Sequence, residues 1–169
     1  MPLTDVRAVV CDVDGVLTDG TLYLGPEGVE LKGFHVHDGA GIQWLLRSGV
    51  GVGLLTGRES EVVARRAREL GIEHVRQGAG DKLAAFEQLL GELGVAAEAA
   101  CYVGDDLADI PVLRRAGLAV AVADAREEVR AAADLVTHAR GGRGAVRELA
   151  ERILKAQGTW AAVVSRYGL

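Results

Sequence analysis

Apolar residues in this chain follow two alternating patterns, short continuous runs and longer stretches with helical spacing. The short runs predict strands that are buried on both faces. They lie at 7–13, 50–56, 74–77, 99–104, 118–122 and 134–138. The stretches with helical spacing lie at 39–48, 60–70, 81–93, 108–116, 126–133 and 144–156. Strands that alternate with helices predict a mostly parallel sheet covered on both faces, which is a doubly wound α/β fold.

Residues at the helix boundaries agree with this pattern. Ser60 and Asp81 precede two of the helical stretches, where their side chains can accept hydrogen bonds from the first backbone N–H groups. Glycines that can end a helix follow four stretches, at Gly49, Gly71, Gly94 and Gly117. No repeat, low-complexity run or linker interrupts the chain. We therefore expect one Rossmann-like domain over residues 1–158 and a C-terminal tail over 159–169.

The stretch 21–34 breaks the alternation of strand and helix. Two strand-like arms flank the sequence Gly-Pro-Glu-Gly at 25–28, which is a turn signal. The apolar residues of the two arms are Leu22, Leu24, Val29 and Leu31. A lone two-stranded hairpin is marginally stable in water, so we expect this protruding hairpin to pack on another surface, such as a second subunit.

Composition and charge narrow the class of protein. Apolar residues make up 49% of the 169 residues and charged residues 25%, which is typical of a globular chain with a sizeable core. The net charge of -5 argues against a nucleic-acid partner, which requires a basic face. No apolar run is long enough to span a bilayer and the N-terminus lacks a secretory pattern, so we expect a cytoplasmic protein without a membrane partner. Cys11 and Cys101 lie in strand-like runs and are predicted to be buried thiols.

Polar side chains collect directly after several of the predicted strands. Asp12 and Asp14 follow the first strand, and because side chains alternate along a strand they start on the same face. The polar residues after later strands or at the next helix are Thr56, Gly57, Arg58, Lys82, Asp105, Asp106 and Asp109. In an open parallel sheet the ligand binds outside the carboxyl ends of the strands, so we expect these residues to converge on one site.

The residue types at this edge point to phosphoryl transfer. Two carboxylates held close together resist joint ionisation unless a cation or a shared proton intervenes. In phosphoryl transfer, one carboxylate can attack phosphorus while a second acts as acid and then as base. A divalent cation, a lysine, a hydroxyl and backbone N–H groups neutralise the phosphate. Mg²⁺ is the expected cation, because it prefers oxygen ligands and phosphate oxygens.

Four motifs, in this order, resemble those of the haloacid dehalogenase superfamily of aspartate-nucleophile phosphatases: "DVDGVLTDG", "LLTGR", "DK" and "VGDDLAD". From about Val6 to Gly158 the chain is similar to the 3-deoxy-D-manno-octulosonate 8-phosphate phosphatase family. That closer match rests on "VHDGAGI", "QGAGDKLAAF", "YVGDDLADIPVL", "VAVADA" and "GGRGAVRE". The resemblance implies a Mg²⁺-dependent phosphomonoesterase that hydrolyses a phosphorylated acidic sugar through an aspartyl-phosphate intermediate.

The resemblance also implies catalytic roles for individual residues. Asp12 is expected to be the nucleophile and Asp14 the acid and base. Thr56 and Lys82 are expected to hold the phosphate. Mg²⁺ is expected on Asp12, on Asp105 and on the backbone carbonyl of Asp14. The residues expected to support this site from behind, or to cap the helix that follows them, are Asp106 and Asp109.

The sugar itself is less tightly specified. The expected substrate contacts are Gly57, Arg58, Arg66, His35 and Asp38. His37 and Gln43, however, stand where the octulosonate enzymes typically carry arginines. Histidine is only partly charged at neutral pH and glutamine is uncharged, so recognition of a sugar carboxylate is weakened at these two positions. A nonulosonate 9-phosphate of the sialic-acid type is therefore an alternative substrate.

Other classes of protein share parts of this pattern. A receiver domain also uses aspartates, threonine and lysine, but its phosphoacceptor follows the third strand, where "HVRQG" has no aspartate. A non-catalytic, phosphate-binding regulatory domain of the same superfamily is a second alternative, although every catalytic position is filled here. A calcium loop of the EF-hand type is excluded, because the loop that starts at Asp12 has its glycine at the fourth position rather than the sixth.

The chain has no room for the inserted cap domain with which many relatives close their site, so we expect a capless enzyme. Between Gly15 and Thr56 it holds only the hairpin and one helix. The resemblance implies a homotetramer whose hairpins form a shared barrel and whose subunits complete each other's sites. The tail is expected near a neighbour's site, with a frayed, disordered end as the alternative.

Overall fold

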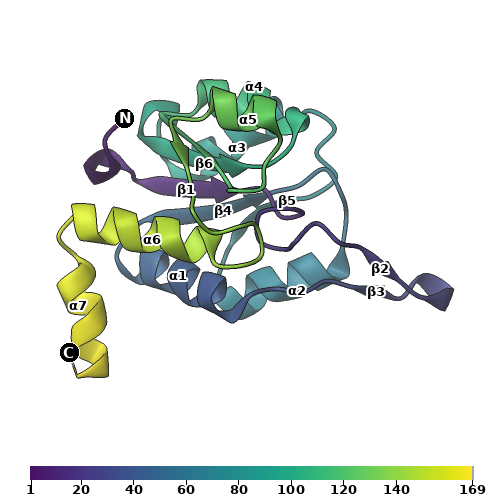
Figure 1. Ribbon diagram of the computed structural model, residues 1–169, viewed down its shortest axis with the longest axis horizontal. Helices are drawn as coiled ribbons and strands as arrows, with labels where there is room; N and C mark the ends of the chain where they lie inside the picture. The colour runs from purple at the N-terminus through teal and green to yellow at the C-terminus, as the bar shows by residue number, and fades with distance from the viewer. Residues whose placement is uncertain (169) are drawn as a thin grey trace.

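Six strands form one parallel sheet in the order β5-β4-β1-β6-β7-β8 (Figure 1). The structure is a computed structural model that describes residues 1–168. The strands span Ala8–Cys11 (β1), Gly51–Leu55 (β4), His74–Arg76 (β5), Ala100–Gly104 (β6), Leu118–Ala121 (β7) and Leu135–Val136 (β8). The chain builds the sheet from β1 outward to β5 and then continues on the other side of β1, from β6 to β8. An open sheet of this kind binds its ligand at the point where the strand order reverses, which here is between β1 and β6. The predicted doubly wound, parallel sheet is confirmed.

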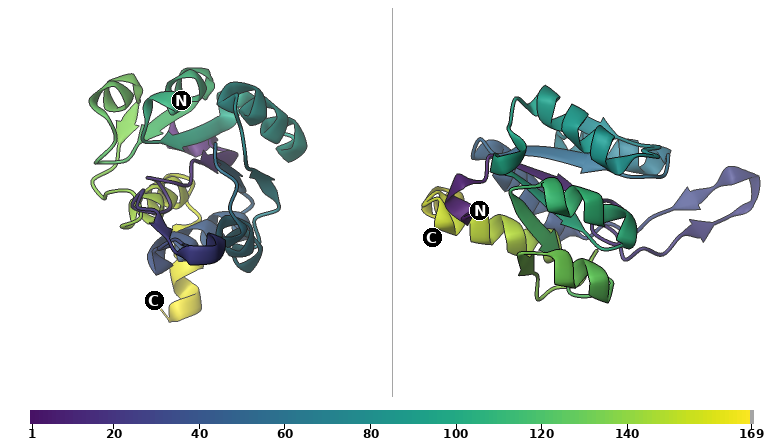
Figure 2. Two further views of the ribbon diagram at one scale, coloured as in Figure 1. Left: turned by 90° about the vertical axis from the view of Figure 1, so that its right-hand side faces the viewer. Right: turned by 90° about the horizontal axis from the view of Figure 1, so that it is seen from above.

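Helices cover both faces of the sheet (Figures 1 and 2). One face carries α1 (Val36–Arg47), α2 (Glu61–Leu70) and α6 (Ala145–Ala156), and α1 packs directly on α6. The other carries α3 (Lys82–Leu93), α4 (Ile110–Arg115) and α5 (Glu127–Ala132). Among residues 1–168, no helix combines the length and the apolarity needed to cross a membrane.

The centre of the sheet carries the core. Every residue of β1 and β6 is buried, as expected for parallel strands that are covered on both faces. Phe86 of α3 packs edge-on against Tyr102 of β6, with the ring centroids 5.7 Å apart. Because both rings are fully buried, they tie one helical layer to the strand that leads into the predicted site.

Element boundaries match the predicted ranges to within a few residues, with two informative differences. Helix α1 begins at Val36 because His35 caps it: Nδ1 of His35 accepts a hydrogen bond from the backbone N–H of His37 at 3.3 Å. The helix predicted over 108–116 is divided into a 3-10 turn at Leu107–Asp109 and α4, which carries a proline in its first turn.

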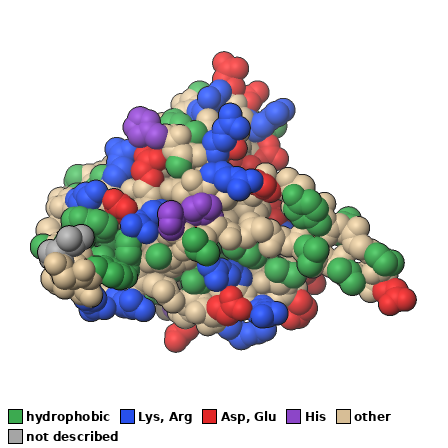
Figure 3. Space-filling view, turned by 60° about the horizontal axis from the view of Figure 1, so that its bottom comes forward, with side chains coloured by type: hydrophobic (Ala, Val, Ile, Leu, Met, Phe, Trp, Pro, Cys, Tyr) green, Lys and Arg blue, Asp and Glu red, His purple; other side chains and the backbone are tan. Residues whose placement is uncertain are grey.

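Residues 21–34 form the predicted hairpin, outside the main sheet. Strands β2 (Tyr23–Leu24) and β3 (Glu30–Leu31) pair antiparallel and project from the molecule (Figures 1 and 3). The exposed apolar side chains on it are Tyr23 (54% exposed), Leu24 (71%), Val29 (52%) and Leu31 (62%). A projection this rich in exposed apolar side chains is typical of an interaction surface.

The tail forms a short helix, α7 (Trp160–Val164), and a 3-10 turn, Ser165–Tyr167. It packs on Trp44 of α1: Trp160 meets that ring edge-on at 5.5 Å, and the indole N–H of Trp44 donates to the Tyr167 hydroxyl at 3.3 Å. The guanidinium of Arg147 lies 3.8 Å from the centre of the same ring. The tail therefore sits at the opposite end of the molecule from the hairpin (Figure 1).

Both thiols lie on adjacent central strands, Cys11 on β1 and Cys101 on β6, and neither is exposed. Burial raises the pKa of both thiols well above the ordinary value, so neither forms a thiolate readily. We expect a thiol-reactive disulfide reagent to leave the native protein unmodified and to label two thiols per chain in denaturant. Rapid labelling of the folded protein would contradict this placement.

Candidate active site

Asp12 lies immediately after β1, at the carboxyl edge of the sheet. Its backbone N–H donates to the carbonyl of Val103 on β6 at 3.0 Å, which extends the strand pairing to the carboxylate itself. Oδ1 of Asp12 accepts a hydrogen bond from the backbone N–H of Val13 at 2.7 Å, and Oδ2 lies 2.9 Å from Nζ of Lys82. The side chain is therefore held at both oxygens while only 5% of the residue is exposed.

Lys82 is the first residue of α3, and the point at which this helix begins places its side chain beside Asp12. The side chain of Asp81 caps this helix by accepting from the backbone N–H groups of Leu83 and Ala84. Nζ of Lys82 also donates to Oδ1 of Asp109 at 2.8 Å. Burial alone would lower the pKa of Lys82, but the charges of Asp12 and Asp109 outweigh burial and raise it. Lys82 is thus a fixed cation beside the predicted nucleophile.

Asp109 is fully buried and has a hydrogen-bond partner at each oxygen. The Tyr102 hydroxyl donates to its Oδ1 at 2.7 Å, and the backbone N–H groups of Asp105 and Asp106 donate to its Oδ2 at 3.0 and 3.1 Å. Asp106 is exposed and caps the same turn, with its Oδ1 accepting from the backbone N–H of Leu107 at 2.8 Å. Asp109 therefore joins the turn after β6 to Lys82.

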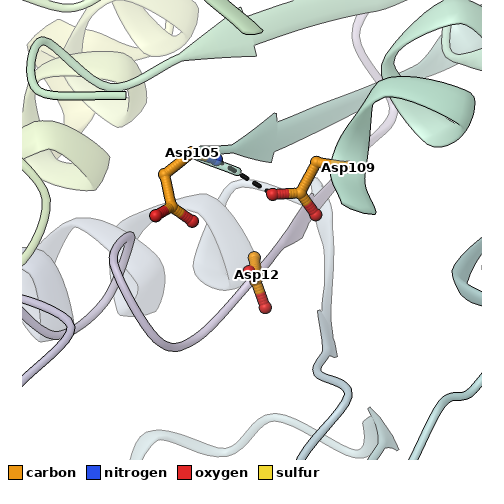
Figure 4. A group of neighbouring side chains, drawn as sticks. All are labelled: Asp12, Asp105 and Asp109. Atoms are coloured by element: carbon orange, nitrogen blue, oxygen red, sulfur yellow. Dashed lines mark hydrogen bonds between the residues drawn. The ribbon is translucent and has the colours of Figure 1, made fainter. Parts of the chain in front are cut away.

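Three carboxylates form the group that can hold a metal among residues 1–168, and Figure 4 shows them around a common space. One oxygen from each of Asp12, Asp105 and Asp109 lies within 4.8 Å of the others. Burial, reinforced by the charge of Asp109, raises the pKa of Asp12 to about 6. Burial and the charges of Asp12 and Asp109 raise the pKa of Asp105 to about 8. Both pKa shifts arise because several negative charges lie close together where little water reaches them.

This crowding fits a divalent cation. Oδ1 of Asp105 is buried and has no hydrogen-bond partner among the described residues, which is the state of an oxygen that a ligand would satisfy. Each oxygen of Asp109 already accepts from two donors, whereas each oxygen of Asp12 has only one partner. Asp12 and Asp105 are therefore the side chains best placed to bind the ion. An all-oxygen donor set of this kind suits Mg²⁺.

Thr56 directly follows β4, the strand beside β1, and so lies at the same edge of the sheet. It is buried, and its hydroxyl oxygen accepts a hydrogen bond from the backbone N–H of Arg58 at 3.3 Å. Gly57 and Arg58 follow it and are exposed. The turn therefore begins at the same edge of the sheet as Asp12, with Thr56 buried and the two residues after it open to solvent.

Asp14 lies on the loop after Asp12, but its side chain is not part of the carboxylate group. Oδ1 of Asp14 instead accepts a hydrogen bond from Nζ of Lys32, a residue of the hairpin arm. The two predicted catalytic carboxylates therefore have different surroundings, one beside Lys82 and one beside Lys32.

Three predicted substrate contacts have other partners in the structure. Asp38 is 1% exposed, and it accepts from the backbone N–H groups of Gly144 and Arg147, which caps α6. His35 caps α1. Arg66 pairs with Glu69, and its guanidinium lies 5.8 Å from the ring of Phe34. Contact between the substrate and these three residues stays a prediction.

Two residues of the site went unpredicted, Tyr102 and Lys32. Tyr102 reads as an ordinary core aromatic in "AACYVG", and only its hydroxyl, 2.7 Å from Asp109, connects it to the site. Lys32 directly follows "VEL" in the second arm of the hairpin. A charged residue beside apolar positions could have marked it as a residue that needs a partner. Its partner is eighteen residues away in the sequence, which no local pattern could identify.

Comparisons with known proteins agree with this geometry. A family model of haloacid dehalogenase-like hydrolases matches residues 70–149. The chain is 51% identical over 154 residues to the 3-deoxy-D-manno-octulosonate 8-phosphate phosphatase KdsC of Salmonella typhi, which covers 91% of this chain and 82% of the relative. The Yersinia pestis phosphatase of the same name superposes with a TM-score of 0.92 at 46% identity, over 94% of this chain and 86% of that one.

A third relative carries ligands. The structure of the 3-deoxy-D-manno-octulosonate 8-phosphate phosphatase from Moraxella catarrhalis is a complex with a magnesium ion, a phosphate ion and a KDO molecule. It superposes with a TM-score of 0.94 at 43% identity, over 98% of this chain and 95% of that one. The relatives therefore share the fold of this chain over nearly its whole length.

Metal binding to the carboxylate group predicts a measurable stabilisation. We expect Mg²⁺ at about 100 times its dissociation constant to stabilise the chelator-treated protein by about 3 kcal/mol, which raises Tm by roughly 6–12 °C. Asp105→Asn should abolish this shift, because it removes a ligand, and should not destabilise the metal-free protein, because a neutral amide relieves the charge crowding. Asp5→Asn, an exposed residue at the N-terminus, is the control and should keep the full shift. An equal Mg²⁺ shift in Asp105→Asn would contradict the assignment.

Proposed function

This chain belongs to the haloacid dehalogenase-like hydrolases, and within them to the 3-deoxy-D-manno-octulosonate 8-phosphate phosphatases, and we propose that it hydrolyses that sugar phosphate with Mg²⁺. The proposal makes it a phosphoric monoester hydrolase of the cytoplasm, with one catalytic domain over residues 1–158. The observation that carries the proposal is the position of Lys82 between Asp12 and Asp109, beside the buried oxygen of Asp105 that has no hydrogen-bond partner among the described residues.

In the first step, a carboxylate oxygen of Asp12 attacks phosphorus, and the bond between phosphorus and the sugar oxygen breaks. Asp14 gives a proton to the leaving sugar oxygen. Lys82 and the hydroxyl of Thr56 hold the phosphate oxygens, together with the backbone N–H groups of the turn at Gly57. The products of this step are the free sugar and phosphorylated Asp12.

In the second step, water attacks the phosphorus of phosphorylated Asp12, and Asp14 accepts the proton that the water loses. The bond between phosphorus and the carboxylate of Asp12 breaks, which releases inorganic phosphate and restores the enzyme. Mg²⁺ on Asp12, Asp105 and the backbone carbonyl of Asp14 would supply positive charge to the phosphate. Asp109 and Tyr102 keep Lys82 in place through both steps.

The octulosonate is favoured as the substrate, because it is named in relatives that match nine tenths or more of this chain. The alternative rests on His37 and Gln43, which replace two arginines of the family pattern. His37 is exposed and Gln43 is half-buried, so neither is locked into the core. A nonulosonate 9-phosphate is therefore the compound against which the octulosonate should be measured.

Release of inorganic phosphate from the two sugar phosphates, with Mg²⁺ present, tests the function. We expect a higher kcat/KM for the octulosonate 8-phosphate, and no turnover in excess chelator. Asp12→Asn should lower kcat by at least about 10³-fold, because the neutral amide is a poor nucleophile, and should trap no phosphorylated enzyme. Asp14→Asn should also be severely impaired while it remains folded. Near-native turnover by Asp12→Asn would refute the mechanism, and a preference for the nonulosonate would change the substrate.

The proposed assembly is a homotetramer built on the hairpin. Its exposed apolar side chains, Tyr23, Leu24, Val29 and Leu31, have no cover within residues 1–168. Residues 1–168 hold no inserted cap domain, so a neighbouring subunit is the available means of closing the site. The tail packs at the opposite end of the molecule from the hairpin, and it would reach a neighbour's site rather than its own (Figure 1).

Light scattering at micromolar concentration tests the assembly. We expect a mass near four times the 17.7 kDa of one chain. The double variant Leu24→Glu, Leu31→Glu should dissociate, because it places a charge on each face of the hairpin in place of an exposed apolar side chain. Val136→Glu, which alters a partly exposed apolar residue of β8, is the matched control and should keep the wild-type mass. A monomeric wild type would refute the tetramer.

A further inference from the structure

Lys32 is the least expected side chain of the hairpin. It directly follows Leu31, which is 62% exposed, yet the side chain of Lys32 has no exposed surface at all. A lysine withdrawn from water is unfavourable unless its charge is paired and its N–H groups are hydrogen-bonded. The burial of Lys32 therefore calls for partners.

Two carboxylates supply them. Nζ of Lys32 donates to Oδ1 of Asp14 and lies 3.8 Å from Oε1 of Glu30. The side chains of these two carboxylates are 19% and 17% exposed, so solvent screens the group only weakly. Lys32 is thus held between Asp14 of the catalytic loop and Glu30 of strand β3.

A third contact anchors Glu30 to the main domain. Its Oε2 accepts a hydrogen bond from the hydroxyl of Ser60, the residue that caps α2. The backbone N–H of Ser60 in turn donates to Oε1 of Gln77 at 2.8 Å. The polar chain therefore runs from the loop after β1, through the hairpin, to the start of α2.

The contact with Lys32 makes the two carboxylate oxygens of Asp14 different in their hydrogen bonding. Oδ1 is bound by Lys32, whereas Oδ2 is buried and has no hydrogen-bond partner among the described residues. A carboxylate free to rotate would present either oxygen, but one that is tied at Oδ1 presents only Oδ2. An acid and base catalyst is effective only when the correct atom lies within hydrogen-bond distance of the reacting oxygen.

We propose that Lys32 is a positioning residue, which fixes the carboxylate of Asp14 so that Oδ2 faces the leaving oxygen of the substrate. The inference rests on the proposed function of Asp14 as the acid and base. Lys32 does not touch the substrate, and it acts through Asp14. Because Lys32 belongs to the hairpin, correct placement of Asp14 also depends on that hairpin being seated on the domain through Glu30 and Ser60.

A purely structural lysine and a positioning lysine differ in how they affect different leaving groups. A sugar alkoxide needs a proton as it leaves, whereas p-nitrophenolate leaves readily without one. We expect Lys32→Met to lower kcat/KM for the sugar phosphate about 10- to 100-fold, since a misplacement of the order of an ångström costs about that much. The loss for p-nitrophenyl phosphate should stay within about threefold, because its departure does not require general-acid catalysis.

Two further variants complete the experiment. Lys32→Arg keeps a charged donor and should recover part of the lost rate for the sugar phosphate. Arg115→Met removes an exposed cation that pairs with Glu87 and Glu98, and it should leave both rates unchanged. If Lys32→Met does not fold, Glu30→Gln takes its place, because it weakens the hold on Lys32 while it preserves the shape of the side chain.

Equal losses for the two substrates, or no loss for either, would overturn the role of Lys32. Failure of the proposed function gives a different result, namely a wild type that hydrolyses neither compound or an Asp12→Asn variant that remains active. Asp14→Asn provides the internal reference, because it should show the same dependence on the leaving group with a larger amplitude.

Discussion

The Lys82 ammonium lies between two carboxylates, 2.9 Å from Asp12 and 2.8 Å from Asp109, and a third carboxylate, Asp105, borders the same space. One fixed cation cannot balance three acids in a volume with little water, and the raised pKa values of Asp12 and Asp105 express the excess negative charge. A divalent cation offsets that excess and at the same time attracts a phosphate. The arrangement of the surrounding loops follows from the need to hold these charges together.

The backbone approaches this group and the loop that carries it so closely that neither Gly15 nor Gly141 has room for a side chain. Gly15 has a φ of +96°, and a Cβ there would lie 2.1 Å from Oδ2 of Asp105. A Cβ at Gly141 would lie 1.7 Å from the carbonyl oxygen of Gly15. The backbone N–H of Gly142 then donates to the carbonyl of Val16 at 2.8 Å. The "GGRG" segment therefore supports the catalytic loop from behind, and Asp38 anchors its far end by capping α6.

The hairpin contributes both to the site and to the proposed assembly. Its outer side chains are apolar and exposed, whereas Lys32 points inward to Asp14 and Glu30 reaches Ser60. A short two-stranded element of this kind is not stable alone. In this chain it is tied to the domain by charge and hydrogen bonds, and its exposed apolar side chains stay available to another subunit. The same fourteen-residue segment therefore links the acid and base residue to the surface proposed for the tetramer.

The alternation of apolar runs and helical stretches in the sequence was sufficient to predict the parallel sheet, because burial on both faces leaves a continuous apolar strand. It also placed Asp12, Thr56, Lys82 and Asp105 at one edge, since parallel strands end together. Tertiary structure decided which polar groups meet. Asp109, expected behind the site, shares the Lys82 ammonium with Asp12, and Asp38, an expected substrate contact, caps α6. Lys32 and Asp14 are distant in sequence, and their contact arises only when the hairpin folds back on the domain. Local patterns report burial and chain direction, whereas pairing between buried charges depends on the packing of separate elements.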